Sequence, residues 1–313
     1  MNPVIRVENL SKKFRKVEAL RGVSLEISRG VVWALLGRNG AGKTTLIKIL
    51  LGLLDPDDGK AEVLGHDCQR ESLEIRRRVG YVPEQPGLYE WMRVDEIGQF
   101  CAAFYPAGYF TAYLEHIKKF GLDPQKKIKE LSKGMRAMVL LALAISHDPD
   151  LLILDEPTSG LDVIVRRQFL ESMVDRAATG KTVFLASHQV HEVERVTDIV
   201  GFLKEGRLIL VDEVEKLKRE IRRWVLIFDN PHSLNDFLNN ISSFPGEIIQ
   251  QTREGLECHI IARSPGDSEP IRQVAISGLR SIDAFPCSLE EIFTAYMNRE
   301  TQPISSQQTE EVS

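Results

Sequence analysis

Alternating apolar and polar residues near the N-terminus predict two β-strands, at residues 4–8 and 23–27, because the side chains of a strand point in turn to its two faces. The run VVWALL at residues 31–36 is apolar throughout, which is typical of a strand buried on both faces. Residues 44–51 have the composition of a helix, and glycines lie between this helix and the strand. The pattern therefore predicts a central strand, a glycine-rich loop and a helix. Further short strands are predicted at residues 61–64 and 79–82.

From about residue 86 to residue 149 the strand patterns disappear and helical spacing takes their place, so we predict a helical subdomain within an α/β domain. Strand patterns return at residues 151–154 and 182–186, separated by a helix at 163–178. This strand–helix–strand arrangement predicts a parallel sheet covered by helices. A hairpin is expected at residues 199–210. The helices of the subdomain are expected at residues 94–104, 110–120 and 135–145.

A charged helix at residues 214–223 leads from the first domain, at residues 1–218, to a smaller second domain at about 219–300. The predicted order strand, helix, strand, strand, helix, strand is typical of a small α+β, ferredoxin-like unit. The last residues, 301–313, are polar and have no apolar periodicity, which predicts a disordered tail. The elements of the second domain are expected at residues 224–228, 233–241, 247–251, 256–262, 270–276 and 280–284, with a final helix at 289–298.

Composition narrows the class of protein. The net charge of −5 gives no reason to expect a nucleic-acid partner. No apolar stretch approaches the roughly 18 residues that cross a bilayer, and the N-terminus has no apolar core of a signal peptide, so we expect a cytoplasmic protein. The four cysteines are scattered and form no C-x-x-C pair, which argues against a zinc site or a disulfide framework.

Residues 37–45 (GRNGAGKTT) fit the spacing G-x-x-x-x-G-K-[ST] of a phosphate-binding loop. In such a loop the backbone N–H groups converge on an anion, and the dipole of the following helix adds positive potential. We expect Lys43 to reach the β- and γ-phosphates and the Thr44 hydroxyl to hold Mg²⁺. A glycine-rich turn that fits by chance is the alternative. The residues predicted to contact nucleotide are Gly37, Asn39, Gly40, Ala41, Gly42, Lys43, Thr44 and Thr45.

The apolar strand at residues 151–154 ends in two carboxylates. Asp155 is placed to hold Mg²⁺, directly or through water. Glu156 can face the γ-phosphate and orient the attacking water as a general base. A strand end with two solvated acids is the alternative, and a phosphate loop earlier in the chain disfavours it.

With these motifs in order, residues 4 to about 212 resemble the nucleotide-binding subunit of an ATP-binding-cassette (ABC) transporter. The resemblance implies an α/β P-loop fold of the ABC ATPase type, with a mixed, mainly parallel sheet, antiparallel edge strands and a helical subdomain. It also implies that Phe14 stacks on adenine, where core packing is the alternative. Gln85, in the loop YVPEQ, would ligate Mg²⁺ or its water and contact the membrane partner, where an exposed polar residue is the alternative.

The sequence LSKGM at residues 131–135 resembles the family's signature loop, although Lys133 and Met135 replace the usual glycine and glutamine. The resemblance implies that Ser132 and the Gly134 amide close over ATP held by a second subunit. Lys133 could contact phosphate or point to solvent.

Two further positions match the family. Asp162, in the sequence SGLD, would couple the two ATP sites of a dimer, and His188 would contact the γ-phosphate. The resemblance thus gives a catalytic set of Lys43, Gln85, Glu156 and His188, and a metal-binding set of Thr44, Gln85 and Asp155.

The leading hypothesis is an ATP-binding and ATP-hydrolysing subunit, with ATP and Mg²⁺ as cofactors, that powers a multi-subunit transporter through ATP-dependent dimer closure. Its partners would be a separate polytopic membrane subunit and a second nucleotide-binding subunit, on the inner face of the cell membrane. The sequence SLEEIF at residues 288–293 and the variant signature loop are similar to exporter-type (ABC-2-like) ATPase subunits of prokaryotes, so export is favoured over import.

Two other classes compete with a transporter subunit. A soluble ABC ATPase that acts on ribosomes or DNA is disfavoured by the single cassette, by the absence of a long coiled-coil pattern and by the acidic balance. A P-loop kinase or GTPase would leave the signature-like loop and His188 without a role, and no guanine-reading Asn-Lys-x-Asp is present. The transported substrate is not encoded in any motif of this chain.

Overall fold

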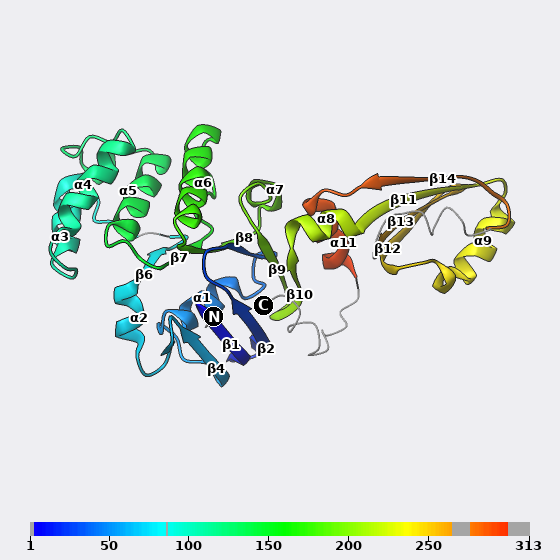
Figure 1. Cartoon of the computed structure of the whole chain (residues 1–313), viewed down its shortest axis with the longest axis horizontal. Helices are drawn as coiled ribbons and strands as arrows, with labels where there is room; N and C mark the ends of the chain where they lie inside the picture. The colour runs from blue at the N-terminus through cyan, green and yellow to red at the C-terminus, as the bar shows by residue number, and fades with distance from the viewer. Residues whose placement is uncertain (1–2, 86, 265–275, 300–313) are drawn as a thin grey trace. The chain divides into compact units, whose positions relative to one another are not determined.

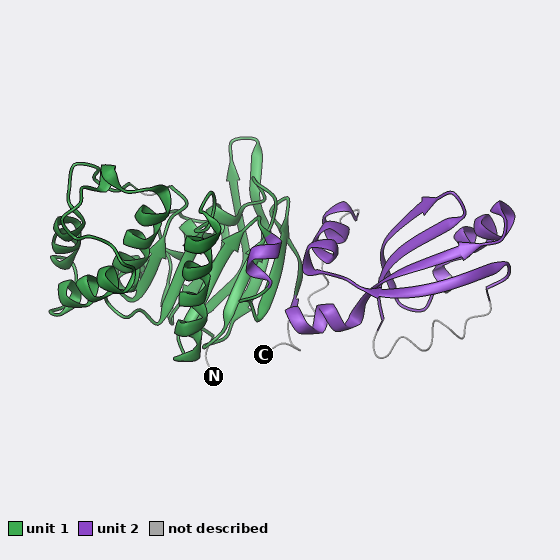
Figure 2. Cartoon of the chain, turned by 90° about the horizontal axis from the view of Figure 1, so that it is seen from above, with its two compact units in different colours: residues 1–189, 195–211, 304–313 green, residues 190–194, 212–303 purple. Residues whose placement is uncertain are grey.

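A computed structural model describes residues 3–85, 87–264 and 276–299, and the chain divides into two compact units (Figures 1 and 2). Within these residues, unit 1 comprises 3–189 and 195–211, and unit 2 comprises 190–194 and 212–299. The predicted domain boundary at 218 remains a prediction. The charged helix α8 (Val214–Glu220) packs on strand β11 (Ile221–Phe228) of unit 2. This packing explains why the contacts divide the chain earlier, at residue 212.

Unit 1 is built on two sheets and a group of helices. Its strands are β1 (Ile5–Phe14), β2 (Val17–Ile27), β3 (Val32–Leu36), β4 (Asp58–Val63), β5 (His66–Asp67), β6 (Val79–Val82), β7 (Leu151–Asp155), β8 (Thr182–Ser187), β9 (Ile199–Lys204) and β10 (Arg207–Glu213). Its helices are α1 (Lys43–Leu50), α2 (Ser72–Arg78), α3 (Val94–Ala102), α4 (Tyr109–Lys119), the 3-10 turn η1 (Ile128–Glu130), α5 (Lys133–Ile145) and α6 (Val163–Ala178).

The central sheet of unit 1 has the strand order β10-β9-β3-β8-β7-β6, and β9, β3, β8, β7 and β6 pair in parallel. Every residue of β3, β7 and β8 is buried, as the continuous apolar runs predicted. The rings of Trp33 and Phe184 stack at 5.4 Å across the β3–β8 pair. Because the strands are parallel, the loops after β3, β6, β7 and β8 all meet at one edge of the sheet.

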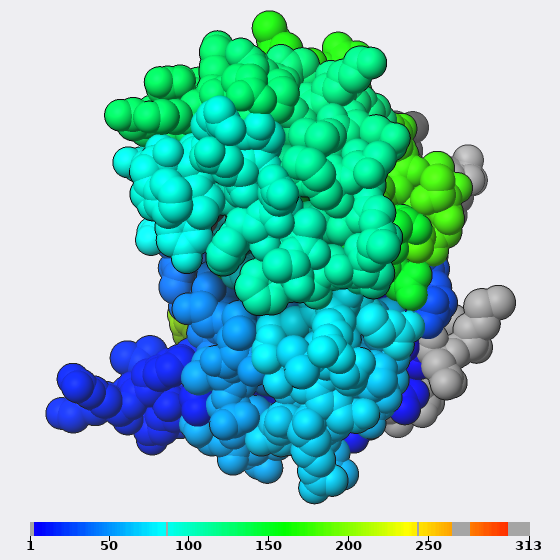
Figure 3. Space-filling model, turned by 90° about the vertical axis from the view of Figure 1, so that its left-hand side faces the viewer, coloured from blue at the N-terminus to red at the C-terminus, as the bar shows by residue number. Residues whose placement is uncertain are grey.

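The second sheet is antiparallel, with the order β2-β1-β4-β5. The strands predicted at residues 4–8 and 23–27 are parts of longer strands, which continue to a hairpin at residues 15–16. Register shifts interrupt the β1–β2 pairing, and Asn9 has a positive φ of 49°. These irregularities explain why simple alternation ends early in the sequence. Figure 3 shows this hairpin, in dark blue, projecting from one face of unit 1.

The helical subdomain consists of α3, α4 and α5, at the positions that their periodicity predicts (Figure 1). The Tyr113 hydroxyl of α4 donates a hydrogen bond of 2.7 Å to the Val94 carbonyl at the start of α3. Helix α5 begins after Ser132, whose hydroxyl accepts a 3.2 Å hydrogen bond from the Met135 amide, as expected for an N-cap serine. The predicted α/β class, with a mainly parallel sheet, antiparallel strands and a helical subdomain, is confirmed.

Unit 2 contains an antiparallel sheet with the order β12-β13-β11-β14. One face of this sheet, including Trp224 and Phe228 of β11, packs against Leu234 and Phe237 of α9. The predicted strand–helix–strand–strand order and the last strand are present, whereas the helix predicted at 270–276 falls on residues outside the described ranges, as does the tail at 301–313. The elements are α7 (Val190–Val193), α8 (Val214–Glu220), β11 (Ile221–Phe228), α9 (Pro231–Asn239), η2 (Ile241–Ser243), β12 (Glu247–Glu254), β13 (Glu257–Arg263), β14 (Leu279–Pro286) and α11 (Leu289–Asn298).

Candidate active site

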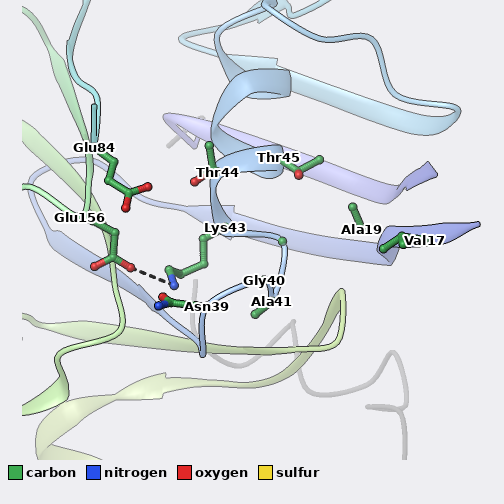
Figure 4. A pocket seen from close by; sticks show the side chains of 11 residues that line it. Val17, Ala19, Asn39, Gly40, Ala41, Lys43, Thr44, Thr45, Glu84 and Glu156 are labelled. Atoms are coloured by element: carbon green, nitrogen blue, oxygen red, sulfur yellow. Dashed lines mark ion pairs between the residues drawn. The ribbon is translucent and has the colours of Figure 1, made fainter. Parts of the chain in front are cut away.

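A cavity of about 290 Å³ opens at the edge of the central sheet where the parallel strands end (Figure 4). The loop between β3 and α1 forms its floor, and β2 and the ends of β6 and β7 supply its walls. All of the predicted loop residues except Gly37 line it. The lining residues are Val17, Ala19, Asn39, Gly40, Ala41, Gly42, Lys43, Thr44, Thr45, Glu84 and Glu156.

Gly42 shows why the loop requires glycine. Its backbone has a φ of 113° and forms the N-cap of α1, a conformation that L-residues with a Cβ rarely adopt. A Cβ at this position would also lie 2.3 Å from the Ala19 carbonyl oxygen. Gly42 therefore lets the loop pass against β2 and aim the first N–H groups of α1 into the cavity, where they suit an anion.

Lys43 connects the loop to the end of β7. Its side chain is only 6% exposed, and its Nζ lies 2.9 Å from Oε1 of Glu156 and donates a 2.8 Å hydrogen bond to the Gly37 carbonyl. The other carboxylate oxygen of Glu156, Oε2, lies 2.7 Å from Nδ1 of His188 and accepts a 3.2 Å hydrogen bond from the His188 amide. The structure thus brings three of the residues predicted for catalysis into direct contact.

The backbone also holds Glu156 in place. Its amide donates a 2.9 Å hydrogen bond to the Ala186 carbonyl of β8, and its φ of 47° lies in the left-handed region. A non-glycine residue in this region costs on the order of 1–3 kcal/mol, and such residues cluster at functional sites. The geometry therefore positions one carboxylate at the cavity at the expense of local strain.

Asp155, the preceding residue, is 1% exposed, and neither of its carboxylate oxygens accepts a hydrogen bond of normal geometry from the described residues. Burial raises the pKa of Asp155; the charges of Glu156 and Glu84 act in the same direction, and the nearby Thr44 hydroxyl and Lys43 oppose them. A buried carboxylate without partners, beside a threonine hydroxyl, is the kind of oxygen ligand set that a hard cation such as Mg²⁺ fits. The residues present are therefore compatible with the predicted metal.

The structure brings Glu84, and not Gln85, to the cavity. Gln85 is exposed and does not line the site, whereas the Glu84 side chain points into it (Figure 4). The reason is the register of the parallel β6–β7 pair: Val82 lies opposite Leu154, so position 84 follows β6 as position 156 follows β7. The role assigned to Gln85 remains a prediction, and the structure adds Glu84 as the side chain of this loop that lines the cavity. The first polar side chain after β6 was the signal that could have identified it.

Phe14 lies at the end of the β1–β2 hairpin, 45% exposed, with the Lys12 ammonium 5.7 Å from its ring centre. It does not line the cavity, but its register partner Val17 does, and so does Ala19. The adenine-stacking role of Phe14 remains a prediction, and the structure adds Val17 and Ala19 as residues that the sequence analysis missed.

The predicted signature loop and Asp162 do not line the cavity; they lie at the N-termini of α5 and α6. The Asp162 carboxylate caps α6 by accepting hydrogen bonds from the amides of Ile164 and Val165, at 3.1 and 3.0 Å. Gly134 packs closely against Val165: a Cβ on Gly134 would lie only 3.1 Å from the methyl groups of Val165. Ser132 is exposed. Ser132 and Asp162 are thus exposed outside the cavity of their own chain, whereas Gly134 is buried.

Lys133 lies against Gly160, in the loop that precedes α6. A Cβ on Gly160 would come within 2.5 Å of the Lys133 Nζ, and the φ of Gly160 is 70°. The Lys133 side chain is exposed and extends along the loop that contains Asp162, and both alternatives considered from sequence, phosphate and solvent, stay open.

A glycine-rich loop at a helix N-terminus, a lysine, a threonine and two carboxylates at the end of the neighbouring strand define a P-loop nucleoside triphosphatase. The comparisons with known proteins specify the family. The sequence model described as "ABC transporter" matches residues 20–159. An ABC transporter ATP-binding protein of Methanocaldococcus jannaschii is 36% identical over 228 residues, which cover 71% of this chain and 82% of that protein.

Two further matches extend the comparison. Nod factor export ATP-binding protein I of Burkholderia lata is 33% identical over 308 residues, which cover 95% of this chain and 98% of that protein. The solved structure of an ATP-binding subunit of an ABC transporter superposes with a TM-score of 0.64 at 31% identity, over 69% of this chain and 92% of the other. The chain belongs to the ABC transporter family, as an ATP-binding and ATP-hydrolysing subunit.

No helix among the described residues is both long enough and apolar enough to cross a bilayer.

Proposed function

We propose that this chain is the ATPase subunit of an exporter, that it binds ATP together with Mg²⁺, and that it works as a dimer of nucleotide-binding subunits. The observation that carries the ATPase part is the contact of Glu156 with both Lys43 and His188 at the phosphate loop. The proposal of export is supported by the similarity to the Nod factor export protein, because that similarity extends over both units of the chain.

Glu156 is the residue that we assign as general base. Its Oε2 is held by the imidazole and the amide of His188, and its Oε1 by the Lys43 ammonium. When the phosphates of ATP occupy the loop, Lys43 is shared with their oxygens, which frees Oε1 to orient a water molecule and to accept its proton. His188 then keeps the carboxylate oriented through its two contacts with Oε2.

Thr44, Asp155 and Glu84 are the residues that we assign to the metal. When bound, Mg²⁺ supplies charge neutralisation at the β- and γ-phosphates. The Thr44 hydroxyl offers an oxygen ligand from the cavity lining, and the buried Asp155 carboxylate, which lies near that hydroxyl, offers a second one from behind the lining. The loop amides after Gly40 and the N-terminus of α1 bind the phosphate oxygens.

The signature-like loop supports the proposal of a dimer. Ser132 and Gly134 lie outside the cavity of their own chain, at the N-terminus of α5. In a head-to-tail dimer they would cover the γ-phosphate of the partner's ATP, so ATP would stabilise the closed state and hydrolysis would release it. A separate membrane subunit would convert this motion into transport, with this chain bound at the inner face of the membrane.

Replacement of Glu156 by Gln tests the proposal. The amide keeps the shape of the side chain but cannot accept a proton, so we expect kcat to fall by about 10²–10⁴-fold while ATP binding persists. A stable ATP-dependent dimer should then appear in light scattering after size exclusion. The matched control is Glu74→Gln, on the exposed surface of α2, which should hydrolyse ATP normally. Turnover at the wild-type rate in Glu156→Gln would falsify the assignment.

The Glu156→Gln chain, carrying an affinity tag and with ATP present, serves to identify the membrane partner. We expect it to co-purify with a polytopic membrane protein from detergent-solubilised membranes of its host. Co-purification with ribosomes or DNA-bound proteins alone would contradict the transporter part of the proposal and leave the ATPase part intact.

A further inference from the structure

Glu84 adds a carboxylate to the cavity that the motifs did not supply. It follows β6 directly, and Figure 4 shows its carboxylate on the same side of the cavity as Glu156, facing Thr44 and the end of Lys43. It is exposed toward the cavity and takes part in no ion pair among the described residues. Its charge is close enough to raise the pKa of Asp155.

The charges around the cavity are therefore unbalanced. Two carboxylates, of Glu84 and Glu156, line the cavity and the buried Asp155 lies close to both, whereas Lys43 is the only cationic side chain among the lining residues. Lys43 is already engaged with Glu156 at 2.9 Å. A triphosphate that entered without a cation would meet a negative carboxylate at the side where the γ-phosphate lies, and like charges at close range repel each other.

The described residues contain no group of three or more His, Cys, Asp or Glu side chains arranged to hold a metal ion by themselves. A cation at this site therefore needs ligands from the nucleotide. This suits Mg²⁺, which is usually bound through one or two carboxylates together with the phosphates of the substrate. A neutral glutamine at position 84 would offer an oxygen ligand without a charge, so the two side chains differ in how strictly they require the cation.

We propose that Glu84 makes nucleotide binding by this chain strictly dependent on a divalent cation, by repelling the metal-free triphosphate and by binding the metal of the metal–nucleotide complex. This inference rests on the proposed function, because it concerns the same cavity. Glu84 is then a specificity-determining residue, because it makes the affinity for the metal complex of ATP higher than the affinity for metal-free ATP.

The test is calorimetric titration of the full chain with a non-hydrolysable ATP analogue, with excess Mg²⁺ or with a chelator. Glu84→Gln should bind the metal-free analogue about tenfold more tightly than the wild type, because the repulsion is removed. In the Mg²⁺ series, the Mg²⁺ concentration that gives half-maximal binding should rise several-fold, because one charged ligand is lost. With Mn²⁺ in place of Mg²⁺, the electron paramagnetic resonance spectrum of the bound ion should change in Glu84→Gln.

Three variants control for net charge and for folding. Gln85→Glu adds a charge at the exposed neighbouring position and should behave as the wild type. The double variant that combines Glu84→Gln with Gln85→Glu keeps the net charge of the wild type, and it should bind nucleotide as Glu84→Gln does. Glu84→Asp keeps the carboxylate and should retain the discrimination against metal-free nucleotide.

The outcomes separate this inference from the proposed function. Equal affinities of wild type and Glu84→Gln for the metal-free analogue, or an equal effect of Gln85→Glu, would overturn the role of Glu84 and leave the ATPase proposal standing. A wild-type chain that binds no nucleotide with or without Mg²⁺ would overturn the proposed function itself.

Discussion

Asp155 and Glu156 are neighbours at the end of β7, but their surroundings give them different properties. Glu156 has an ion pair with Lys43 on Oε1 and a hydrogen bond with His188 on Oε2, whereas Asp155 is buried with neither an ion pair nor a hydrogen bond of normal geometry among the described residues. An isolated buried carboxylate destabilises a fold unless a cation or donor compensates it. Asp155 is thus the residue at which binding function and stability of the unliganded chain oppose each other.

Replacement of Asp155 by Asn is expected to raise the free energy of unfolding of the metal-free chain by about 1–3 kcal/mol, since it removes an unsatisfied buried charge. It should also weaken Mg²⁺-dependent nucleotide binding. Urea unfolding and calorimetry measure the two effects. Asp175→Asn, at an exposed position on α6, is the control and should change neither quantity.

The same residue gives a pH dependence. Burial raises the pKa of Asp155 above its ordinary value of 3.8, so the folded chain binds this proton more tightly than the unfolded chain does. The free energy of unfolding therefore falls as the pH rises from 3.8 through the raised pKa. Across that range the wild type should lose stability relative to Asp155→Asn. A constant difference between the two chains would contradict the assignment.

At the scale of elements, the starts of α5 and α6 are packed together by glycines. Gly134 lets α5 approach Val165 of α6. Gly160, in the loop that precedes the N-cap Asp162, leaves room for the Lys133 side chain. Both helices have polar N-caps, Ser132 and Asp162. The loops before α5 and α6, which are expected to face a partner subunit, are therefore in contact with each other.

Replacement of Gly160 by Ala should lower the free energy of unfolding by about 1–2 kcal/mol, because its φ of 70° is unfavourable for alanine, and should also displace Lys133. Gly180→Ala is the matched control, since Gly180 has a φ of 81° with no atom near its missing Cβ. Thermal unfolding should show a larger loss for Gly160→Ala. The excess should disappear in a Lys133→Ala background, because interacting positions are non-additive. Equal losses at both glycines would mean that the contact with Lys133 contributes nothing.

At the scale of the whole molecule, the two units have separate cores. Unit 2 has its own apolar cluster around Trp224, and it also contains the three charged residues Asp212, Glu220 and Arg263. Arg263 binds the carboxylates of Asp212 and Glu220, the latter at 2.7 Å. These two carboxylates raise the pKa of Arg263 although burial opposes them. The network therefore stabilises unit 2 without any contribution from the cavity.

Replacement of Arg263 by Met should destabilise unit 2 by about 3 kcal/mol, because two largely buried carboxylates lose their close partner and keep only Lys216 at 3.6 Å and Arg219 at 3.7 Å. Calorimetry is expected to resolve an earlier unfolding transition for unit 2, while unit 1 still binds ATP with wild-type affinity. Arg253→Met, at an exposed position of β12, should leave both transitions in place. A single shifted transition would contradict the independence of the two units.

The sequence by itself determined the features that depend on neighbouring residues. The phosphate loop, the strand that ends in Asp155 and Glu156, the helical subdomain and most strands of unit 2 follow from local motifs and periodicity. Their physical basis is short-range: backbone conformation, side-chain alternation and the spacing of loop amides.

Only the tertiary structure decided which side chains from distant segments meet at the cavity. The register of β6 against β7 places Glu84, and not Gln85, beside Glu156. Strand β2 brings Val17 and Ala19 to the opposite wall, and the packing of α5 on α6 directs Lys133 to Gly160. A shift of one residue turns a side chain away from its site, and pairing between strands that are seventy residues apart is not encoded in any local pattern.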